Sequence, residues 1–295
     1  MMKILSLDGG GSGGLATAIY LSEIEYVTGK PIHQLFDLIT GVSTGAIIAC
    51  ALGGKMPAAV LVDAYKAEIP RIFEKPWWAP WRGYLFEAKY DKAHLKQAIR
   101  RFLPGVSLKS MHTKVMFHAG QVAPLGMVKT KFWKSWRHED QREPLVDIIA
   151  ASCSAPTYFP PERLGEDVFV DGAMAVNNPA IPGICEAKRL GWTDIACVSL
   201  EVNRTAGMTS KDAASRVSAW DWVPRIFAAS ATFGQDLAIY EMQSLLGPGR
   251  ALSARMNLAE PIDAKGAEFY ARCNLQAELA WSSTGKEVLD IIYAT

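Results

Sequence analysis

The chain has 295 residues, of which 49% are hydrophobic and 21% charged, a composition typical of globular proteins that excludes a disordered chain. Its 31 basic and 30 acidic side chains leave a net charge of +1, so no global positive field is directed at a nucleic-acid polymer. The five cysteines form no CxxC pair, which favours buried free thiols in a reducing compartment over a disulfide framework or a zinc site.

The N-terminal apolar run gives no sign of a secretory segment. Residues 3–7 are too short for a signal core and lead directly into glycines. No apolar run elsewhere reaches the length of a membrane-spanning helix. We therefore expect a cytoplasmic protein that meets membranes only at their surface.

Strands and helices are predicted to alternate along the chain. Apolar runs predict strands at residues 4–7, 36–39, 114–119, 167–170, 194–200 and 250–258. Helical spacing of apolar residues predicts helices at 15–27, 46–52, 55–72, 91–103, 145–153 and 179–190, a mainly helical stretch at 215–246, and terminal helices at 266–280 and 285–294. The expected fold is α/β, with a mainly parallel central sheet sandwiched by helices. Residues 1–295 show no linker or repeat, so one domain is expected.

A glycine-rich loop follows the first strand, where residues 8–14 read Asp-Gly-Gly-Gly-Ser-Gly-Gly. Such a row exposes backbone N–H groups that can hold the oxygen of a tetrahedral intermediate. It also satisfies G-x-G-x-x-G, so a nucleotide-binding oxidoreductase is an alternative hypothesis. A dinucleotide site needs an acidic residue at the end of the second strand, roughly 20 residues on. Asp37 instead begins that strand, which argues for the oxyanion loop.

A serine turn follows the second strand, where residues 41–45 read Gly-Val-Ser-Thr-Gly. In a Gly-x-Ser-x-Gly elbow the serine lies on a strained turn, exposed above the edge of the sheet. The N-terminus of the next helix favours negative charge that develops there. The alternative is an ordinary strand–helix turn that happens to contain Ser43.

The base that would activate Ser43 is predicted to be a carboxylate. None of the five histidines lies beyond residue 138, so the last third of the chain supplies none, which argues against the ordinary α/β-hydrolase triad with its order Ser, Asp, His. Asp171 leaves a strand, and Gly172 keeps the approach to its carboxylate open. A shielded carboxylate that is hydrogen-bonded to the serine can accept its proton. The alternative is a turn residue, because Asp-Gly is a common turn pair.

Two aromatic segments allow more than one interpretation. For residues 73–86 we favour a loop whose aromatics plug the core over a flap above an apolar substrate or an interfacial aromatic patch. In a flap, the acyl-chain contacts would be Trp77, Trp78, Trp81 and Phe86. Residues 129–138 interleave basic with aromatic side chains. We favour a solvated, half-buried segment there over a site for lipid headgroups or a polyanion.

Four motifs together resemble the patatin-like phospholipase family. They are residues 8–14, residues 41–45, the segment Ala-Ser-Cys-Ser-Ala-Pro-Thr-Tyr-Phe at 151–159, and Asp-Gly-Ala at 171–173 with Asn-Asn-Pro at 177–179. The resemblance covers roughly residues 3–200, whereas residues 201–295, expected to be mainly helical, carry no transferable motif. It implies a hydrolase with a Ser–Asp dyad that removes acyl chains from phospholipids or other acyl lipids, without a metal or organic cofactor.

The resemblance also implies roles for single residues and for partners. Ser43 would be the nucleophile and Asp171 the general base, and the oxyanion hole would comprise the backbone N–H groups of Gly9, Gly10, Gly11 and Thr44. Gly13 stands where the family often has Arg or Lys, so a catalytically weakened binding protein is a further alternative. The expected partners are an acyl lipid and a membrane surface. Some bacterial relatives are switched on by a nucleotide or a protein, but an activator is not readable from this sequence.

Overall fold

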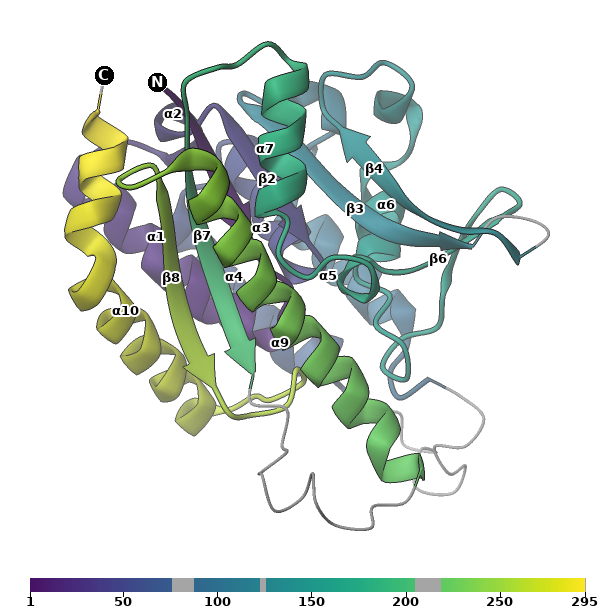
Figure 1. Cartoon of the computed structure of the whole chain (residues 1–295). Coiled ribbons are helices and arrows are strands. Elements are labelled where there is room, and N and C mark those ends of the chain that lie inside the picture. Colours follow the sequence, from purple (N-terminus) through teal and green to yellow (C-terminus); the bar gives the residue numbers. More distant parts are fainter. Residues whose placement is uncertain (76–87, 123–125, 205–218, 295) are drawn as a thin grey trace.

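A mixed eight-stranded sheet forms the centre of the molecule (Figure 1). The computed structural model describes residues 1–75, 88–122, 126–204 and 219–294. The strand order is β5-β6-β3-β2-β1-β7-β8, and β4 also pairs with β3. The strands are β1 (Met2–Leu7), β2 (Leu38–Val42), β3 (Lys114–Val122), β4 (Val128–Lys134), β5 (Glu162–Leu164), β6 (Asp167–Asp171), β7 (Ile195–Arg204) and β8 (Ala251–Leu258).

The neighbours from β3 through β2, β1 and β7 to β8 run parallel, whereas β4, β5 and β6 form antiparallel pairs. This arrangement confirms the predicted α/β fold with a mainly parallel sheet. Side chains alternate between the two faces, so Leu5 and Leu7 enter one apolar core and Ile4 enters the other. Burial on both faces explains the continuous apolar character of β1.

Helices cover both faces of this sheet (Figure 1). One face carries α1 (Gly14–Thr28), α3 (Thr44–Gly53), α6 (Leu145–Ser152) and α10 (Ala267–Tyr293), and onto this layer pack α2 (Ile32–Leu35), α4 (Ala58–Ile72) and α5 (Lys92–Phe102). The other face carries α7 (Ala180–Arg189) and α9 (Ala219–Leu246). Short 3₁₀ turns are η1 (Gly11–Gly13), η2 (Leu108–Ser110), η4 (Asp140–Arg142) and η5 (Gly172–Met174). None of the helices described here is long and apolar enough to cross a bilayer.

The prediction of two terminal helices was wrong, because α10 runs without interruption through Gly285. Contacts with α1 hold the helix across the predicted break. Thr284 Oγ1 lies 2.7 Å from the Tyr20 hydroxyl, and the Trp281 ring packs edge-on against the Tyr20 ring. A glycine inside a helix costs only about 1 kcal/mol relative to alanine, which such packing offsets.

The segment at residues 129–138, predicted to be solvated and half-buried, is half-buried in the structure, and its first part is strand β4. Trp133 is fully buried and packs between the rings of Phe117 and Phe169. Basic side chains of this segment form internal ion pairs, of Lys131 with Asp140 at 2.8 Å and of Lys134 with Glu186 at 2.7 Å. Two of the cations considered for lipid headgroups are therefore already neutralised within the protein.

All five cysteines are free thiols, as predicted. Burial is confirmed for four of them and was wrong for Cys185, which is exposed on α7. The second strand differs from its prediction at both ends, because it begins at Leu38 and continues to Val42, directly before the serine turn.

Candidate active site

The site lies where the ends of β1, β2 and β6 meet. Strands β1 and β2 are parallel neighbours, so the glycine loop and the Ser43 turn leave the same edge of the sheet. Strand β6 approaches from the opposite direction along the same side of β3. Val42 pairs with His118 and Asp171 pairs with Ala119, so β2 and β6 end against consecutive residues of β3. This topology brings the two predicted catalytic residues together.

Ser43 occupies a strained turn between β2 and α3, with φ of 54° and ψ of −124°. A β-carbon on Gly45 would overlap the carbonyl oxygen of Leu7, and one on Gly41 would overlap the backbone of Gly45. Both glycines of the Gly-x-Ser-x-Gly pattern are therefore required by close backbone packing. The turn has the geometry of a nucleophile elbow.

The Ser43 hydroxyl donates a hydrogen bond to Asp171 Oδ2 at 2.7 Å. The carboxylate is only 2% exposed, and its Oδ1 accepts the backbone N–H of Ala173 at 2.8 Å. Burial raises the pKa of Asp171 to about 7, although the hydrogen bonds from Ala173 and Ser43 act in the opposite direction. A carboxylate with this pKa can take up and return a proton near neutral pH.

The glycine loop packs directly against Ser43. A β-carbon on Gly9 would lie 2.8 Å from Asn177 Oδ1 and 3.4 Å from the Ser43 β-carbon, so a side chain there would fill the space above the serine. Within the described residues, the backbone N–H groups of Gly9, Gly11 and Thr44 donate no hydrogen bond. These N–H groups are therefore not committed to other acceptors in the part of the chain that the structure describes.

A buried polar network supports the glycine loop from below. Asp8 is 2% exposed and accepts a hydrogen bond from Gln235 Nε2 on α9 at 2.6 Å. Burial, together with the neighbouring Glu201, raises the pKa of Asp8 well above its ordinary value. Glu201 is itself held by Ser253 and Arg255 of β8. Sequence reasoning missed this network, because its members lie far apart in the chain.

The last residue of α6 and the residues directly after it hold both members of the Ser43–Asp171 pair. Ser152 Oγ accepts the backbone N–H of Ser43 at 3.0 Å and donates to the carbonyl oxygen of His118 at 2.6 Å. The carbonyl oxygen of Ser154 accepts the backbone N–H of Asp171 at 2.9 Å. Cys153 lies beside Ser43, and burial raises the pKa of its thiol. The segment was noted in the sequence as a motif, but no role was predicted for its serines.

The structure disfavours two alternatives for the chemistry. His118 is fully buried, bonds through Nε2 to the carbonyl oxygen of Val176, and has a pKa lowered to about 4 by burial, so it is placed to hold the backbone. Asp37 accepts the backbone N–H of Lys3 at the start of β1, the end of the sheet opposite to the glycine loop. A ribose bound at that loop would therefore be out of its reach.

The remaining sequence predictions concern ligands. The four aromatic residues expected to hold an acyl chain, Trp77, Trp78, Trp81 and Phe86, lie outside the described residues. Among the residues that are described, no group of three or more His, Cys, Asp or Glu side chains could hold a metal ion.

Comparison with known proteins connects this geometry to a family. A model of the family described as patatin-like phospholipase matches residues 5–184, which include the glycine loop, the Ser43 elbow and Asp171. The chain belongs to the patatin-like phospholipase family. Its sequence is 35% identical over 191 residues to a protein of Pseudomonas aeruginosa named cGAMP-activated phospholipase. The matched region covers 63% of this chain and 56% of that protein.

Other relatives of this patatin-like chain carry phospholipase names too. A cGAMP-activated phospholipase of Vibrio cholerae is 32% identical over 218 residues, covering 65% of this chain and 59% of that protein. The human calcium-independent phospholipase A2-gamma is 29% identical over 223 residues, covering 66% of this chain and 27% of that protein. The chain thus matches little more than half the length of the two bacterial relatives.

A solved structure shows the same fold over nearly the whole chain. VipD from Legionella pneumophila superimposes with a TM-score of 0.53 at 11% identity, covering 96% of this chain and 67% of VipD. At this identity the likeness concerns the fold alone.

Proposed function

We propose that this protein is an acyl-lipid hydrolase of the phospholipase A type, in which Ser43 is the nucleophile and Asp171 the general base. The observation that carries the proposal is the 2.7 Å hydrogen bond from the Ser43 hydroxyl to a buried carboxylate whose pKa is raised to about 7. Family membership and the phospholipase names of the relatives support the lipid substrate.

In the first half of the reaction, Ser43 Oγ attacks the carbonyl carbon of the ester while its proton moves to Asp171. The carbonyl oxygen becomes an oxyanion, which backbone N–H groups of Gly9, Gly10, Gly11 and Thr44 would stabilise. Each such donor typically contributes roughly 2.7–4 kcal/mol to transition-state stabilisation. The intermediate then collapses, the bond to the lysolipid oxygen breaks, and that oxygen leaves with the proton from Asp171.

In the second half, water attacks the acyl-enzyme and gives a proton to Asp171. The bond between Ser43 Oγ and the acyl carbon breaks, the fatty acid leaves, and the proton returns from Asp171 to Ser43. One side chain therefore moves every proton in the cycle, which suits a carboxyl group with a pKa near neutrality.

Hydrolysis of p-nitrophenyl esters and of phospholipid vesicles tests this proposal. Ser43→Ala should abolish turnover, and Asp171→Asn should lower it at least a hundredfold, while both variants keep the circular dichroism spectrum of the wild type. A fluorophosphonate should label Ser43 in the wild type. Labelling of another serine, or near-normal turnover of Asp171→Asn, would reject the dyad.

Two further arms of the assay concern the activator and the membrane. Because relatives are named cGAMP-activated phospholipases, turnover is measured with and without cGAMP. We also propose that the protein works at the membrane surface, and flotation of Ser43→Ala with phospholipid vesicles tests this contact. Recovery of all protein in the vesicle-free fraction would contradict it.

A further inference from the structure

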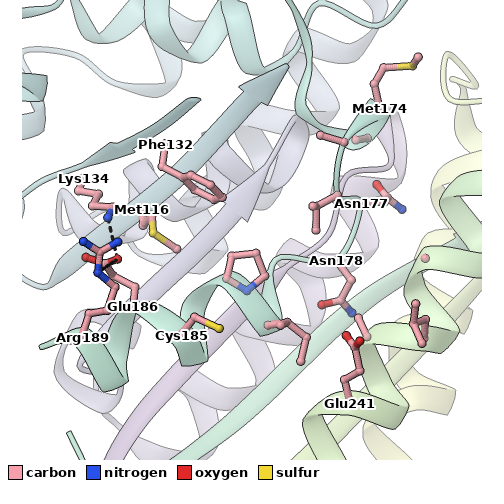
Figure 2. A pocket seen from close by; sticks show the side chains of 18 residues that line it. Met116, Phe132, Lys134, Met174, Asn177, Asn178, Cys185, Glu186, Arg189 and Glu241 are labelled. Atoms are coloured by element: carbon pink, nitrogen blue, oxygen red, sulfur yellow. Dashed lines mark ion pairs between the residues drawn. The ribbon is translucent and has the colours of Figure 1, made fainter. Parts of the chain in front are cut away.

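A cavity of about 480 Å³ lies next to the dyad, on the face of the sheet that carries α7 and α9 (Figure 2). Strands β3 and β4 form one wall, the segment at residues 173–178 forms the end nearest Asp171, and α7 and α9 form the remaining walls. The volume falls within the range of roughly 300–1,000 Å³ that is usual for small-molecule sites. Apolar side chains line much of it, among them Met116, Phe132, Ile181, Pro182, Leu237 and Ala238, and Glu241 of α9 lines it as well.

One end of this cavity adjoins the catalytic residues. Ala173 lines the cavity, and its backbone N–H donates to Asp171 Oδ1. Asn177 lines the cavity as well, and its Oδ1 lies beside Gly9, the glycine that packs against Ser43. The segment that contacts Asp171 and the glycine loop thus also forms a wall of the cavity, which places this end of the cavity one residue layer from Ser43.

The opposite end of the cavity is charged. Lys134 and Glu186 form an ion pair of 2.7 Å there, with side chains about one-tenth exposed, and Arg189 lies 3.9 Å from Glu186 (Figure 2). Toward this charged end, Ile181, Cys185 and Arg189 follow one another at helical spacing along α7. Eight residues of α-helix span about 12 Å, which gives the length of this wall.

We propose that this cavity binds the acyl chain of the substrate, with the ester at Ser43 and the methyl end directed toward the Lys134–Glu186 pair. The inference rests on the proposed function and names the part of the substrate that the site selects. An apolar channel suits a hydrocarbon chain, and burying each methylene contributes about 0.8 kcal/mol, or roughly fourfold in kcat/KM. Hydrolysis should therefore rise with chain length until the methyl end meets the ion pair, which costs free energy to desolvate.

The chain carries a built-in reporter of this cavity. Cys185 lines it, and Figure 2 shows the sulfur directed inward. The other four cysteines are buried, so a thiol reagent should modify Cys185 first. Occupancy of the cavity is thus measurable without turnover.

The first experiment follows the rate at which a maleimide modifies Cys185 in the Ser43→Ala protein. Monomeric dodecanoate should slow this rate at least fivefold, whereas acetate at the same concentration should leave it unchanged. Ser43→Ala/Cys185→Ser serves as the control and should lose the fast phase of labelling. Equal labelling rates with dodecanoate and acetate would overturn the assignment, whether or not the protein hydrolyses esters.

The second experiment measures the ratio of kcat/KM for p-nitrophenyl dodecanoate to that for the acetate. Ile181→Trp places an indole in the cavity and should lower this ratio at least tenfold. Gln243→Trp, at an exposed position of α9 that does not line the cavity, is the matched control and should keep the wild-type ratio. An unchanged ratio in Ile181→Trp would refute the acyl-chain site. Absence of all ester hydrolysis in the wild type would instead refute the proposed function. The labelling experiment would then show whether the cavity binds an acyl chain.

Discussion

Ser152 Oγ lies 3.0 Å from the backbone nitrogen of Ser43 and accepts its hydrogen bond, although 109 positions separate the two residues in the chain. The same hydroxyl donates to the carbonyl oxygen of His118, at the point on β3 where β2 ends. Ser152 is fully buried, so neither bond exchanges with water. It therefore ties the strained elbow to the strand against which Asp171 also ends, and we infer that it positions Ser43, the proposed nucleophile.

The first prediction concerns Ser152→Ala. This change leaves the Ser43 N–H buried without its acceptor, which costs about 1–3 kcal/mol. If the elbow relaxes away from Asp171, kcat should fall tenfold to a hundredfold with KM nearly unchanged. Steady-state kinetics on a p-nitrophenyl ester provide the measurement.

A matched control for Ser152 is available two residues away. Ser154→Ala removes bonds to Lys92 Nζ and to the carbonyl oxygen of Ala150 but keeps the carbonyl that holds Asp171. The kcat of Ser154→Ala should therefore be at least ten times the kcat of Ser152→Ala. Equal losses in kcat would show that Ser152 acts through general stability and not through the elbow.

The second prediction concerns the pH dependence of activity. In the proposed mechanism Asp171 must be deprotonated to accept the Ser43 proton, and its pKa is raised to about 7. Below this pH, kcat/KM should fall about tenfold per pH unit, and above it a plateau is expected. A profile measured from pH 5 to pH 9 tests the assignment, and a flat profile across pH 6 to 8 would contradict it.

The third prediction concerns the cost of Asp171 to stability. Its pKa is about 7 in the folded protein against an ordinary value of 3.8, so the folded state binds more protons between these pH values and loses stability as pH rises through them. Asn does not titrate. As pH rises from 4 to 8, the free energy of unfolding of Asp171→Asn should therefore increase by a few kcal/mol relative to that of the wild type. Urea unfolding of both proteins at the two pH values gives the comparison, and a constant difference would count against the raised pKa.

The fourth prediction concerns the packing of the elbow. A β-carbon on Gly45 would overlap the carbonyl oxygen of Leu7, which belongs to the rigid strand β1. Gly45→Ala should therefore lower the free energy of unfolding by about 1–3 kcal/mol. Thermal unfolding followed by circular dichroism measures this loss.

Gly234 on α9 offers the contrasting substitution, because a β-carbon there meets nothing within 4 Å. Gly234→Ala should raise stability by about 0.5–1 kcal/mol, as expected for alanine in place of glycine in a helix. A similar shift of the melting temperature in both variants would mean that close packing does not require a glycine at position 45.

Much of this protein could be predicted from local patterns in the sequence. The apolar runs of β1 and β7 and the periodicity of α1 and α7 identify the elements, since such periodicity reports which side of an element is buried. The glycines around Ser43 identify a turn whose backbone packs too closely for side chains. Asp171 was predicted as the base by elimination, because the histidines end at residue 138.

Tertiary structure alone decided how these parts meet. Ser43 and Asp171 are 128 positions apart, and they touch because β6 turns back along β3 and ends one residue beyond β2. Burial at that junction, which no local pattern encodes, raises the pKa of Asp171. The support from Ser152, the network under Asp8 and the unbroken α10 likewise depend on contacts between distant segments. Local sequence determines which elements form, whereas pairing and burial across the chain determine which side chains share one site.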